Sequence, residues 1–243
     1  MIETHDLRRV FGGISALDGV TLSIAAGERR AIIGPNGAGK TTLFNVLTGE
    51  LPPTSGTIEL GGEDVTRRQP YQLARRGLAR MYQRNELFDP LSARDNVALA
   101  IGASAGPYRP FTSPPASERA TSDELLARVG LAARADMPAR ALSHGERRQL
   151  ELALALAQRP RVLLLDEPTA GMSGAETARI TELIASLDRS LTIVIVEHDM
   201  DVVFRLADRI SVLHEGRVLA EGTPEQMRGD RVVNEVYLGK IVA

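Results

Sequence analysis

The chain has 243 residues, 43% of them hydrophobic, which suits one α/β domain with a sizeable core. Its net charge of −2 gives no electrostatic reason to expect nucleic acid as the main partner. Because the sequence lacks cysteine, disulfides, thiolate metal sites and cysteine nucleophiles are excluded. The first residues lack the basic and apolar regions of a signal peptide. The longest apolar runs are far shorter than the roughly 18 residues needed to span a bilayer. We therefore expect a soluble protein that can dock on a membrane protein.

Alternating polar and apolar residues open the chain and predict β-structure, and from residue 30 onward strand patterns alternate with helical ones. Strands are expected at residues 4–10, 19–24, 30–33, 57–60, 78–82, 161–166, 191–196, 209–214 and 217–220. Helices are expected at residues 42–48, 70–76, 118–129, 146–158, 174–187, 201–207 and 232–238, with a short one after Thr223. This alternation predicts an α/β fold with a mainly parallel sheet that helices cover.

The middle of the chain has a different character, because residues 85–158 contain no expected strand. Within it, residues 102–117 are rich in glycine, serine and proline, which is typical of an irregular connection. We expect a single domain over residues 1–243. Its core would comprise residues 1–84 and 159–243, and residues 85–158 would form an inserted α-helical subdomain.

The strongest motif lies between an expected strand and an expected helix, where residues 34–41 read G-x-x-x-x-G-K-T. In such a loop the backbone N–H groups and the helix N-terminus bind phosphate. Lys40 is expected to reach the β- and γ-phosphates, and the Thr41 hydroxyl to bind Mg²⁺. The residues expected to bind nucleotide here are Asn36, Gly37, Ala38, Gly39, Lys40, Thr41 and Thr42. The chain has 29 basic residues but only two lysines, so it keeps a compact ammonium where one fits inside a phosphate-wrapping loop.

A second motif is the apolar run before Asp166 and Glu167. A buried strand that ends in two acids places carboxylates at the edge of the sheet where α/β proteins bind ligands. Asp166 is then expected to hold Mg²⁺, and Glu167 to orient or deprotonate the attacking water. The alternative is that both are solvated acids at a strand end.

The segment Leu142-Ser143-His144-Gly145-Glu146 reads as a capping box that opens a helix. Together with the two motifs above, it resembles the ATP-binding cassette family, whose signature reads Leu-Ser-Gly-Gly-Gln. The resemblance implies a P-loop NTPase core, an N-terminal antiparallel β portion and an inserted helical subdomain. It also implies that Ser143 and Gly145 complete the nucleotide site of the opposite subunit in a head-to-tail dimer.

The resemblance assigns roles to three further residues. Phe11 matches the aromatic residue that stacks on adenine, and its alternative is an ordinary core phenylalanine. Gln83 matches the glutamine that senses Mg²⁺ and the membrane subunit, which makes it both a catalytic and a metal-binding candidate. His198 matches the switch histidine that contacts the γ-phosphate.

Three positions depart from the family pattern. His144 stands where the signature has its first glycine, and Glu146 where it has glutamine; because Gly145 is kept, we expect these changes only to tune the site. Ser173 replaces the acidic residue found at that position in most of the family. Ser173 still caps a helix with Glu176, but communication across the dimer could differ.

Within the family, Phe11-Gly12-Gly13, residues 197–200 and residues 236–239 resemble ATP-binding subunits of branched-chain amino acid importers, a pattern that urea and amide importers share. This resemblance implies an ATPase subunit of a bacterial importer that uses ATP and Mg²⁺. Its implied partners are integral membrane permease subunits, a second ATP-binding subunit and, indirectly, a solute-binding protein. It would lie peripherally on the cytoplasmic face of the inner membrane. The alternatives are a soluble cassette ATPase acting on nucleic acid or ribosomes, and a nucleotide-regulated binding module without hydrolysis.

Overall fold

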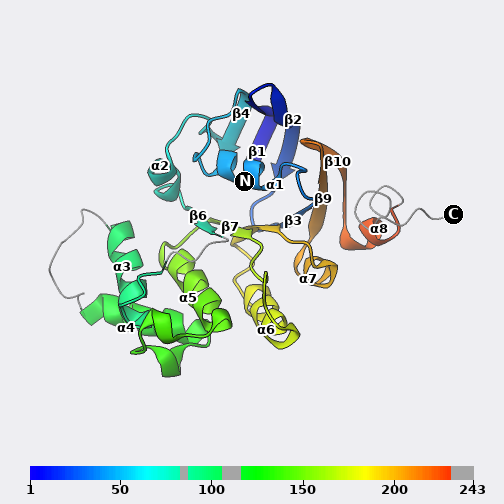
Figure 1. Cartoon of the computed structure of the whole chain (residues 1–243). Helices are drawn as coiled ribbons and strands as arrows, with labels where there is room; N and C mark the ends of the chain where they lie inside the picture. Colours follow the sequence, from blue (N-terminus) through cyan, green and yellow to red (C-terminus); the bar gives the residue numbers. More distant parts are fainter. Residues whose placement is uncertain (83–86, 106–115, 231–243) are drawn as a thin grey trace.

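The computed structural model describes residues 1–82, 87–105 and 116–230, and it arranges the strands of these residues in two sheets (Figure 1). The smaller sheet is antiparallel, with strand order β2-β1-β4-β5. Its strands are β1 (Ile2–Phe11), β2 (Ile14–Ile24), β4 (Ser55–Leu60) and β5 (Glu63–Asp64). The larger sheet has the order β10-β9-β3-β8-β7-β6. Its strands are β3 (Arg29–Ile33), β6 (Leu78–Met81), β7 (Val162–Asp166), β8 (Thr192–Val196), β9 (Arg209–His214) and β10 (Arg217–Gly222).

The larger sheet is parallel except for β10, which pairs antiparallel with β9. This confirms the predicted mainly parallel sheet. Every residue of β3, β7 and β8 is buried, as expected when both faces of a sheet are covered, and this includes the polar residues Arg29, Arg30, Asp166 and Thr192. Side chains alternate between the faces: Leu164 packs into the core beneath the antiparallel sheet, and Leu163 and Leu165 pack into the core on the other side.

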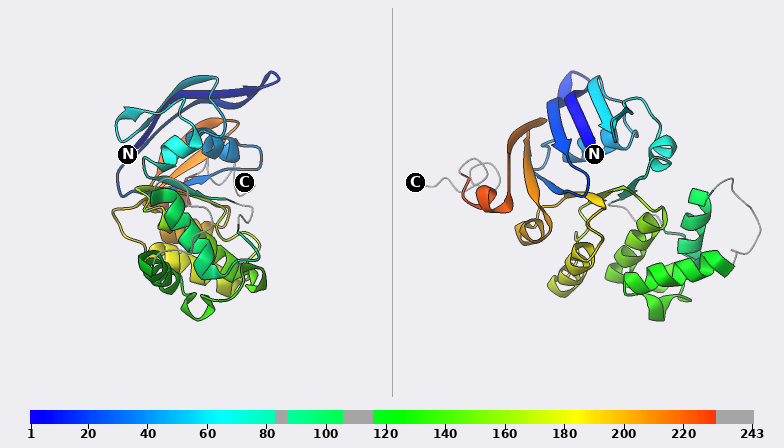
Figure 2. Two further views of the ribbon diagram at one scale, coloured as in Figure 1. Left: turned by 90° about the vertical axis from the view of Figure 1, so that its left-hand side faces the viewer. Right: turned by 180° about the vertical axis from the view of Figure 1, so that it is seen from behind.

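The helices cover both faces of the larger sheet (Figures 1 and 2). The helices are α1 (Lys40–Leu47), α2 (Pro70–Ala74), α3 (Ala93–Ala105), α4 (Ala116–Arg128), α5 (His144–Ala157), α6 (Gly174–Ala185), α7 (Met200–Leu206) and α8 (Pro224–Arg228). Helix α1 lies between the two sheets, and its Leu43, Phe44 and Leu47 share one apolar core with residues of both. Helices α5, α6 and α7 lie on the opposite face. Both faces of the larger sheet are thus covered, so a ligand can reach the sheet only at its edges.

Helices α3 and α4 stand away from both sheets and pack against each other and α5 (Figures 1 and 2). Helix α3 was not predicted from the sequence. The irregular connection predicted for residues 102–117 is wrong at both ends, because α3 continues to Ala105 and α4 begins at Ala116. A local signal was available in Ser92 and Asp95: Ser92 Oγ donates to Asp95 Oδ2 at 2.6 Å and accepts from Asp95 N at 3.0 Å. The proposed bounds of a helical subdomain stay a prediction.

Other expected elements differ from the observed ones mainly at their ends. The largest change is in β2, which begins at Ile14 rather than residue 19 because it pairs with β1 as far as the turn at Gly12 and Gly13. The capping boxes at Ser143, Ser173 and Thr223 are confirmed. The helix expected at residues 232–238 lies outside the described residues. Within the described ranges, no helix is both long enough and apolar enough to cross a bilayer.

Candidate functional site

Residues 34–39 form the loop that joins β3 to α1. Two of its glycines are required by close packing. A Cβ atom on Gly34 would lie 2.1 Å from the carbonyl oxygen of Leu213, and one on Gly39 would lie 2.5 Å from that of Ala16. Gly39 also has a φ of 102° and no side chain to cap α1. The first N–H groups of α1 therefore lack a side-chain cap, which is the arrangement that binds anions at a helix N-terminus.

Lys40 is the first residue of α1, and its ammonium is folded onto the loop. Nζ donates to the carbonyl oxygen of Gly34 at 2.6 Å and to that of Pro35 at 3.0 Å. The pKa of Lys40 is lowered, chiefly because burial penalises the charged ammonium, and the charges of Glu167 and Asp166 partly oppose this effect. The charges of Asp166, which ends β7, and of Glu167, the next residue, thus act on the ammonium of Lys40.

The other loop residues expected to bind nucleotide divide into exposed and buried ones. Asn36, Gly37 and Thr41 are exposed, and Thr42 is half-buried. Ala38 has its side chain in the core at 2% exposure, so only its backbone is placed to meet a ligand. The nucleotide contacts of this loop remain a prediction. We expect backbone groups to make most of them.

Asp166 and Glu167 lie at the carboxyl end of β7, beside the end of β8. Asp166 is buried, with 3% of its surface exposed. Glu167 N donates to the carbonyl oxygen of Val196 at 2.9 Å, and Glu167 has a φ of 47°. A left-handed conformation is uncommon outside glycine and is often found at functional sites. The two acids therefore differ: one is buried at the strand end, and the other turns out of the strand.

Sequence reasoning missed Arg80 in β6. Its Nη2 donates to Asp166 Oδ2 at 2.6 Å, and both side chains are 5% exposed. Its Nη1 donates to Asn45 Oδ1 at 2.7 Å, and its guanidinium lies 4.7 Å from the ring centroid of Tyr82. An arginine inside the otherwise apolar strand Leu78–Met81 was the available signal, because a buried cation needs a buried partner.

His198 follows β8, and its side chain is 64% exposed. Its backbone N–H donates to the carboxylate of Glu197, a fully buried residue that also accepts hydrogen bonds from Thr169. In the sequence, residues 197–200 supported only a resemblance to a family. The buried position of Glu197 was therefore not predicted.

Phe11 ends β1 at the turn formed by Gly12 and Gly13. Its side chain is 42% exposed, so the alternative of an ordinary core phenylalanine is wrong. The guanidinium of Arg9 lies 4.5 Å from the centre of the ring. An exposed aromatic ring of this kind can offer a face to a base.

Ser143 and Gly145 lie at the N-terminus of α5. The Ser143 hydroxyl accepts from Glu146 N at 3.2 Å, and Ser143 N donates to Glu146 Oε2 at 2.8 Å. His144 Nε2 lies 3.3 Å from the carbonyl oxygen of Ala170, which ties this segment to the loop after Glu167. No hydrogen bond or ion pair joins residues 143–146 to residues 34–42 within the described part of the chain. Gln83 lies outside the described residues.

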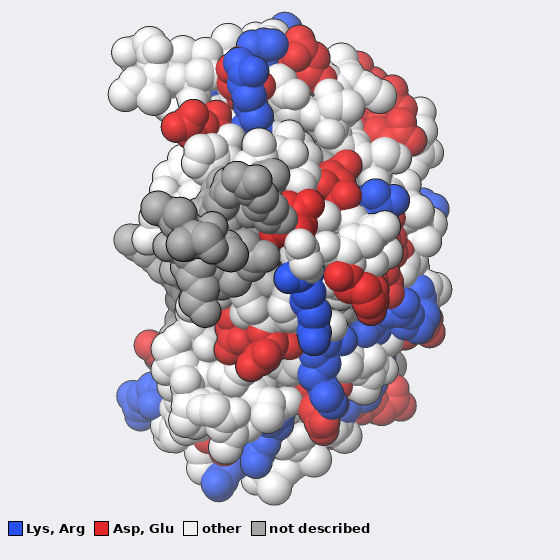
Figure 3. All heavy atoms as spheres, turned by 90° about the vertical axis from the view of Figure 1, so that its right-hand side faces the viewer, with Lys and Arg blue, Asp and Glu red and all other residues white. Residues whose placement is uncertain are grey.

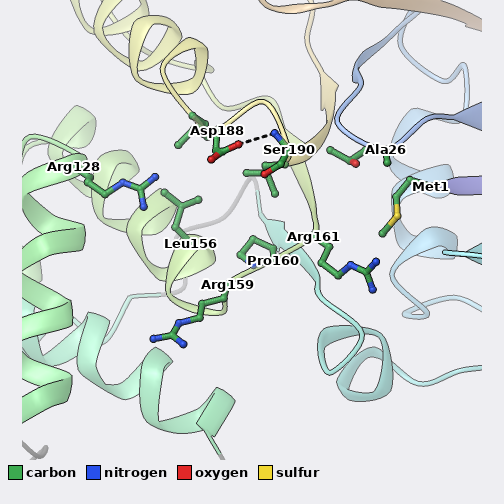
Figure 4. A pocket seen from close by; sticks show the side chains of 12 residues that line it. Met1, Ala26, Arg128, Leu156, Arg159, Pro160, Arg161, Asp188 and Ser190 are labelled. Atoms are coloured by element: carbon green, nitrogen blue, oxygen red, sulfur yellow. Dashed lines mark hydrogen bonds between the residues drawn. The ribbon is translucent and has the colours of Figure 1, made fainter.

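A separate pocket of about 450 Å³ lies at the opposite edge of the larger sheet, near the start of β8 (Figure 4). Arg128, Arg159 and Arg161 line it, and Asp188 accepts a hydrogen bond from Ser190 N at 2.7 Å on its wall. None of the residues predicted for the nucleotide site lines this pocket.

Comparisons with known proteins agree with this geometry. Residues 17–170 match the family model described as ABC transporter. The chain is 37% identical to the high-affinity branched-chain amino acid transport ATP-binding protein BraF of Pseudomonas aeruginosa, covering 99% of this chain and 98% of that one. It is 38% identical to LivG of Escherichia coli, which bears the same description, with the same coverage.

Solved structures give the same result. The ADP conformation of MJ1267, an ATP-binding cassette of an ABC transporter, superposes with a TM-score of 0.87 at 29% identity, covering 99% of both chains. A dimeric cassette, MJ0796 in a post-hydrolysis state bound to ADP and Pi, gives a TM-score of 0.78 at 28% identity, covering 92% of this chain and 99% of that one. The predicted P-loop α/β fold is thereby confirmed. The chain belongs to the ABC transporter family and is one of its ATPases.

Proposed function

We propose that the chain is the ATP-hydrolysing subunit of a bacterial importer for branched-chain amino acids or a related small polar solute such as urea or an amide. The observation that carries this proposal is the similarity to BraF and LivG, which extends over almost the full length of each chain. Both relatives are described as ATP-binding proteins of branched-chain amino acid transport.

The loop of residues 34–42 would hold the triphosphate of ATP. The uncapped N-terminus of α1 supplies N–H donors, and Lys40 supplies a positive charge that already lies inside the loop. On binding, the ammonium would exchange its two carbonyl acceptors for phosphate oxygens. Phe11, exposed at the end of β1, would stack on the adenine ring.

The residues proposed for Mg²⁺ offer the oxygen donors that this ion takes. Thr41 is exposed at the start of α1, and only Oδ2 of Asp166 is engaged by Arg80. Asp166 Oδ1 accepts no hydrogen bond from any residue that the structure describes. One hydroxyl and one carboxylate oxygen, completed by phosphate and water, make a suitable set for Mg²⁺. When bound, the ion would neutralise charge on the β- and γ-phosphates; Gln83 is proposed as a further ligand.

Glu167 would accept a proton from the attacking water or orient it, and His198 would contact the γ-phosphate. Supporting this proposal are the position of Glu167 just beyond β7 and its charge interaction with Lys40. Ser143 and Gly145 would close over the nucleotide of a second subunit, because they make no bond to the loop of their own chain. A dimeric relative with ADP and Pi supports such pairing.

The alternative function, action on nucleic acid or ribosomes, has no electrostatic support. On the face shown in Figure 3, basic and acidic side chains are interspersed, in keeping with the net charge of −2. We propose instead that the subunit sits peripherally on the cytoplasmic face of the inner membrane, bound to permease subunits and acting indirectly with a solute-binding protein.

Affinity purification from detergent-solubilised membranes of the source cells tests this function. The expected result is copurification of integral membrane subunits, identified by mass spectrometry, together with this chain or a similar ATP-binding subunit. Membranes from cells that lack the tag serve as the control. Recovery with ribosomes or DNA and without membrane subunits would favour the alternative function.

A further inference from the structure

Glu197 is a buried acid that the nucleotide site does not use directly. It follows β8, and none of its surface is exposed. Its Oε1 accepts from Thr169 N at 3.0 Å and from Thr169 Oγ1 at 2.5 Å, while its Oε2 accepts from His198 N at 3.0 Å. No lysine or arginine in residues 1–82, 87–105 or 116–230 forms an ion pair with it.

Both oxygens of Glu197 act as hydrogen-bond acceptors in this arrangement. A buried carboxylate without a strong cationic partner is costly unless its oxygens are hydrogen-bonded. The carboxylate accepts hydrogen bonds from two backbone N–H groups and one hydroxyl, and Nδ1 of His198 lies 3.8 Å from its Oε2. A glutamine could satisfy Thr169 through its oxygen, but its NH₂ group would then face the His198 N–H, donor against donor. The carboxylate therefore matches both neighbours simultaneously.

The two oxygens of this carboxylate bind different parts of the site. Thr169 lies in the turn that follows Glu167, where Ala170 N donates to the carbonyl oxygen of Glu167 at 3.2 Å. The other oxygen, Oε2, accepts from His198 N and so fixes the backbone of His198, the residue directly after Glu197. One carboxylate thus links the backbone beside the proposed general base to the backbone of the proposed γ-phosphate contact.

We propose that Glu197 is a positioning residue for hydrolysis, which holds the turn 167–170 and His198 in one fixed relative geometry. The proposal rests on the roles proposed above for Glu167 and His198. Because Glu197 is fully buried, it would act through Thr169 and His198. Its loss would move the groups that act on the γ-phosphate and leave the loop of residues 34–42 intact.

The first test is Glu197→Gln, assayed by phosphate release under conditions where the variant is fully folded. We expect kcat to fall about 10- to 100-fold, because a misplacement of about 1 Å can cost that much. The KM for ATP should stay within about twofold, because the phosphate-binding loop is untouched. Hydrogen–deuterium exchange should show faster exchange in residues 167–170 and at His198. The matched control is Glu182→Gln, an exposed glutamate on α6.

A second pair of variants keeps the test decisive if Glu197→Gln does not fold. Thr169→Val removes only the hydroxyl bond and should lower kcat in the same way, to a smaller extent. Thr169→Ser should restore kcat because it keeps the hydroxyl. Thr181→Val is the matched control, because Thr181 is also buried and donates to Thr177 O at 2.7 Å within α6.

The outcomes separate this proposal from the site assignment. If Glu167→Gln abolishes hydrolysis while Thr169→Val and Glu197→Gln keep the kcat of the unaltered chain, Glu197 has no positioning role. A loss of melting temperature without a change in kcat would likewise show a purely structural role. If Glu167→Gln itself hydrolyses ATP normally, the proposed role of Glu167 fails, and the positioning proposal fails with it.

Discussion

Arg80 and Asp166 form a buried ion pair between neighbouring strands, with 2.6 Å between Nη2 and Oδ2. Arg80 lies in β6 and pairs with Leu164 of the parallel strand β7; Asp166, which ends β7, is two residues beyond Leu164. The guanidinium is also bonded to Asn45 Oδ1 at 2.7 Å, so it connects the acid to α1. The pair engages one oxygen of the carboxylate, and the other oxygen is the one proposed above for Mg²⁺, so Arg80 is part of the structural support of the proposed site.

Arg80→Met is expected to lower the free energy of unfolding by about 3–5 kcal/mol, because it leaves Asp166 buried without its cation. The double variant Arg80→Met with Asp166→Asn should recover part of this loss, since no buried charge then remains. Urea unfolding followed by circular dichroism measures both, because the chain has no tryptophan. The control is Arg205→Met, whose partner Glu182 is exposed and whose pair is worth about 0–1 kcal/mol. A loss as small as that of the control would contradict the importance of the buried pair.

The positions of the main motifs followed from the sequence because each depends on local chemistry. The loop before Lys40 needs glycines in sequence order, and Asp166 needs only an apolar run before it. The partner of Arg80 and the bond between Glu197 and Thr169 could not be predicted, because each joins segments that lie far apart in the chain. Helix α3 was missed for another reason: its glycine and polar residues weaken the helical pattern, and it is stabilised by packing against α4 and α5.

Lys40→Ala is expected to weaken ATP binding by about 100-fold or more, because it removes charge-assisted hydrogen bonds worth about 1.5–3 kcal/mol each. Equilibrium binding of a fluorescent ATP analogue measures this change. Lys40→Arg should not restore affinity, since the compact ammonium lies within 2.6 Å and 3.0 Å of two loop carbonyls, where a planar guanidinium does not fit. Unaltered affinity in Lys40→Ala would contradict the phosphate-binding role of the loop.

Glu146 gives α5 a cap that depends on pH. Its pKa is lowered, first by the hydrogen bond from Ser143 N and also by Arg134, so the folded state favours the carboxylate. Because the folded pKa lies below the unfolded one, this stabilisation is present above the ordinary glutamate pKa and is lost as pH falls through the folded pKa.

Glu146→Gln should therefore remove part of the fall in stability below about pH 4.3, the ordinary glutamate pKa. Chemical unfolding at several acid pH values measures this slope. Ser143→Ala is the comparison: it keeps the backbone N–H, the largest cause of the lowered pKa of Glu146, but loses the hydroxyl, which caps the helix and also lowers that pKa. Stability should therefore drop at every pH, and the acid slope should decrease less than in Glu146→Gln. An identical acid slope in Glu146→Gln and the unaltered chain would show that the cap does not titrate with folding.

Glu167→Gln is expected to lower kcat by about 10²–10⁴-fold, because an amide cannot accept the proton of the attacking water. The shape of the side chain is kept, and the Glu167 N bond to Val196 O does not involve the side chain, so the turn should stay intact. ATP binding through residues 34–42 should persist.

Because ATP is then bound but not consumed, the paired state should accumulate, as seen by light scattering after gel filtration with and without ATP. Glu182→Gln, which changes an exposed glutamate in the same way, should hydrolyse ATP and show no such accumulation. Full hydrolysis by Glu167→Gln would mean that another group activates the water.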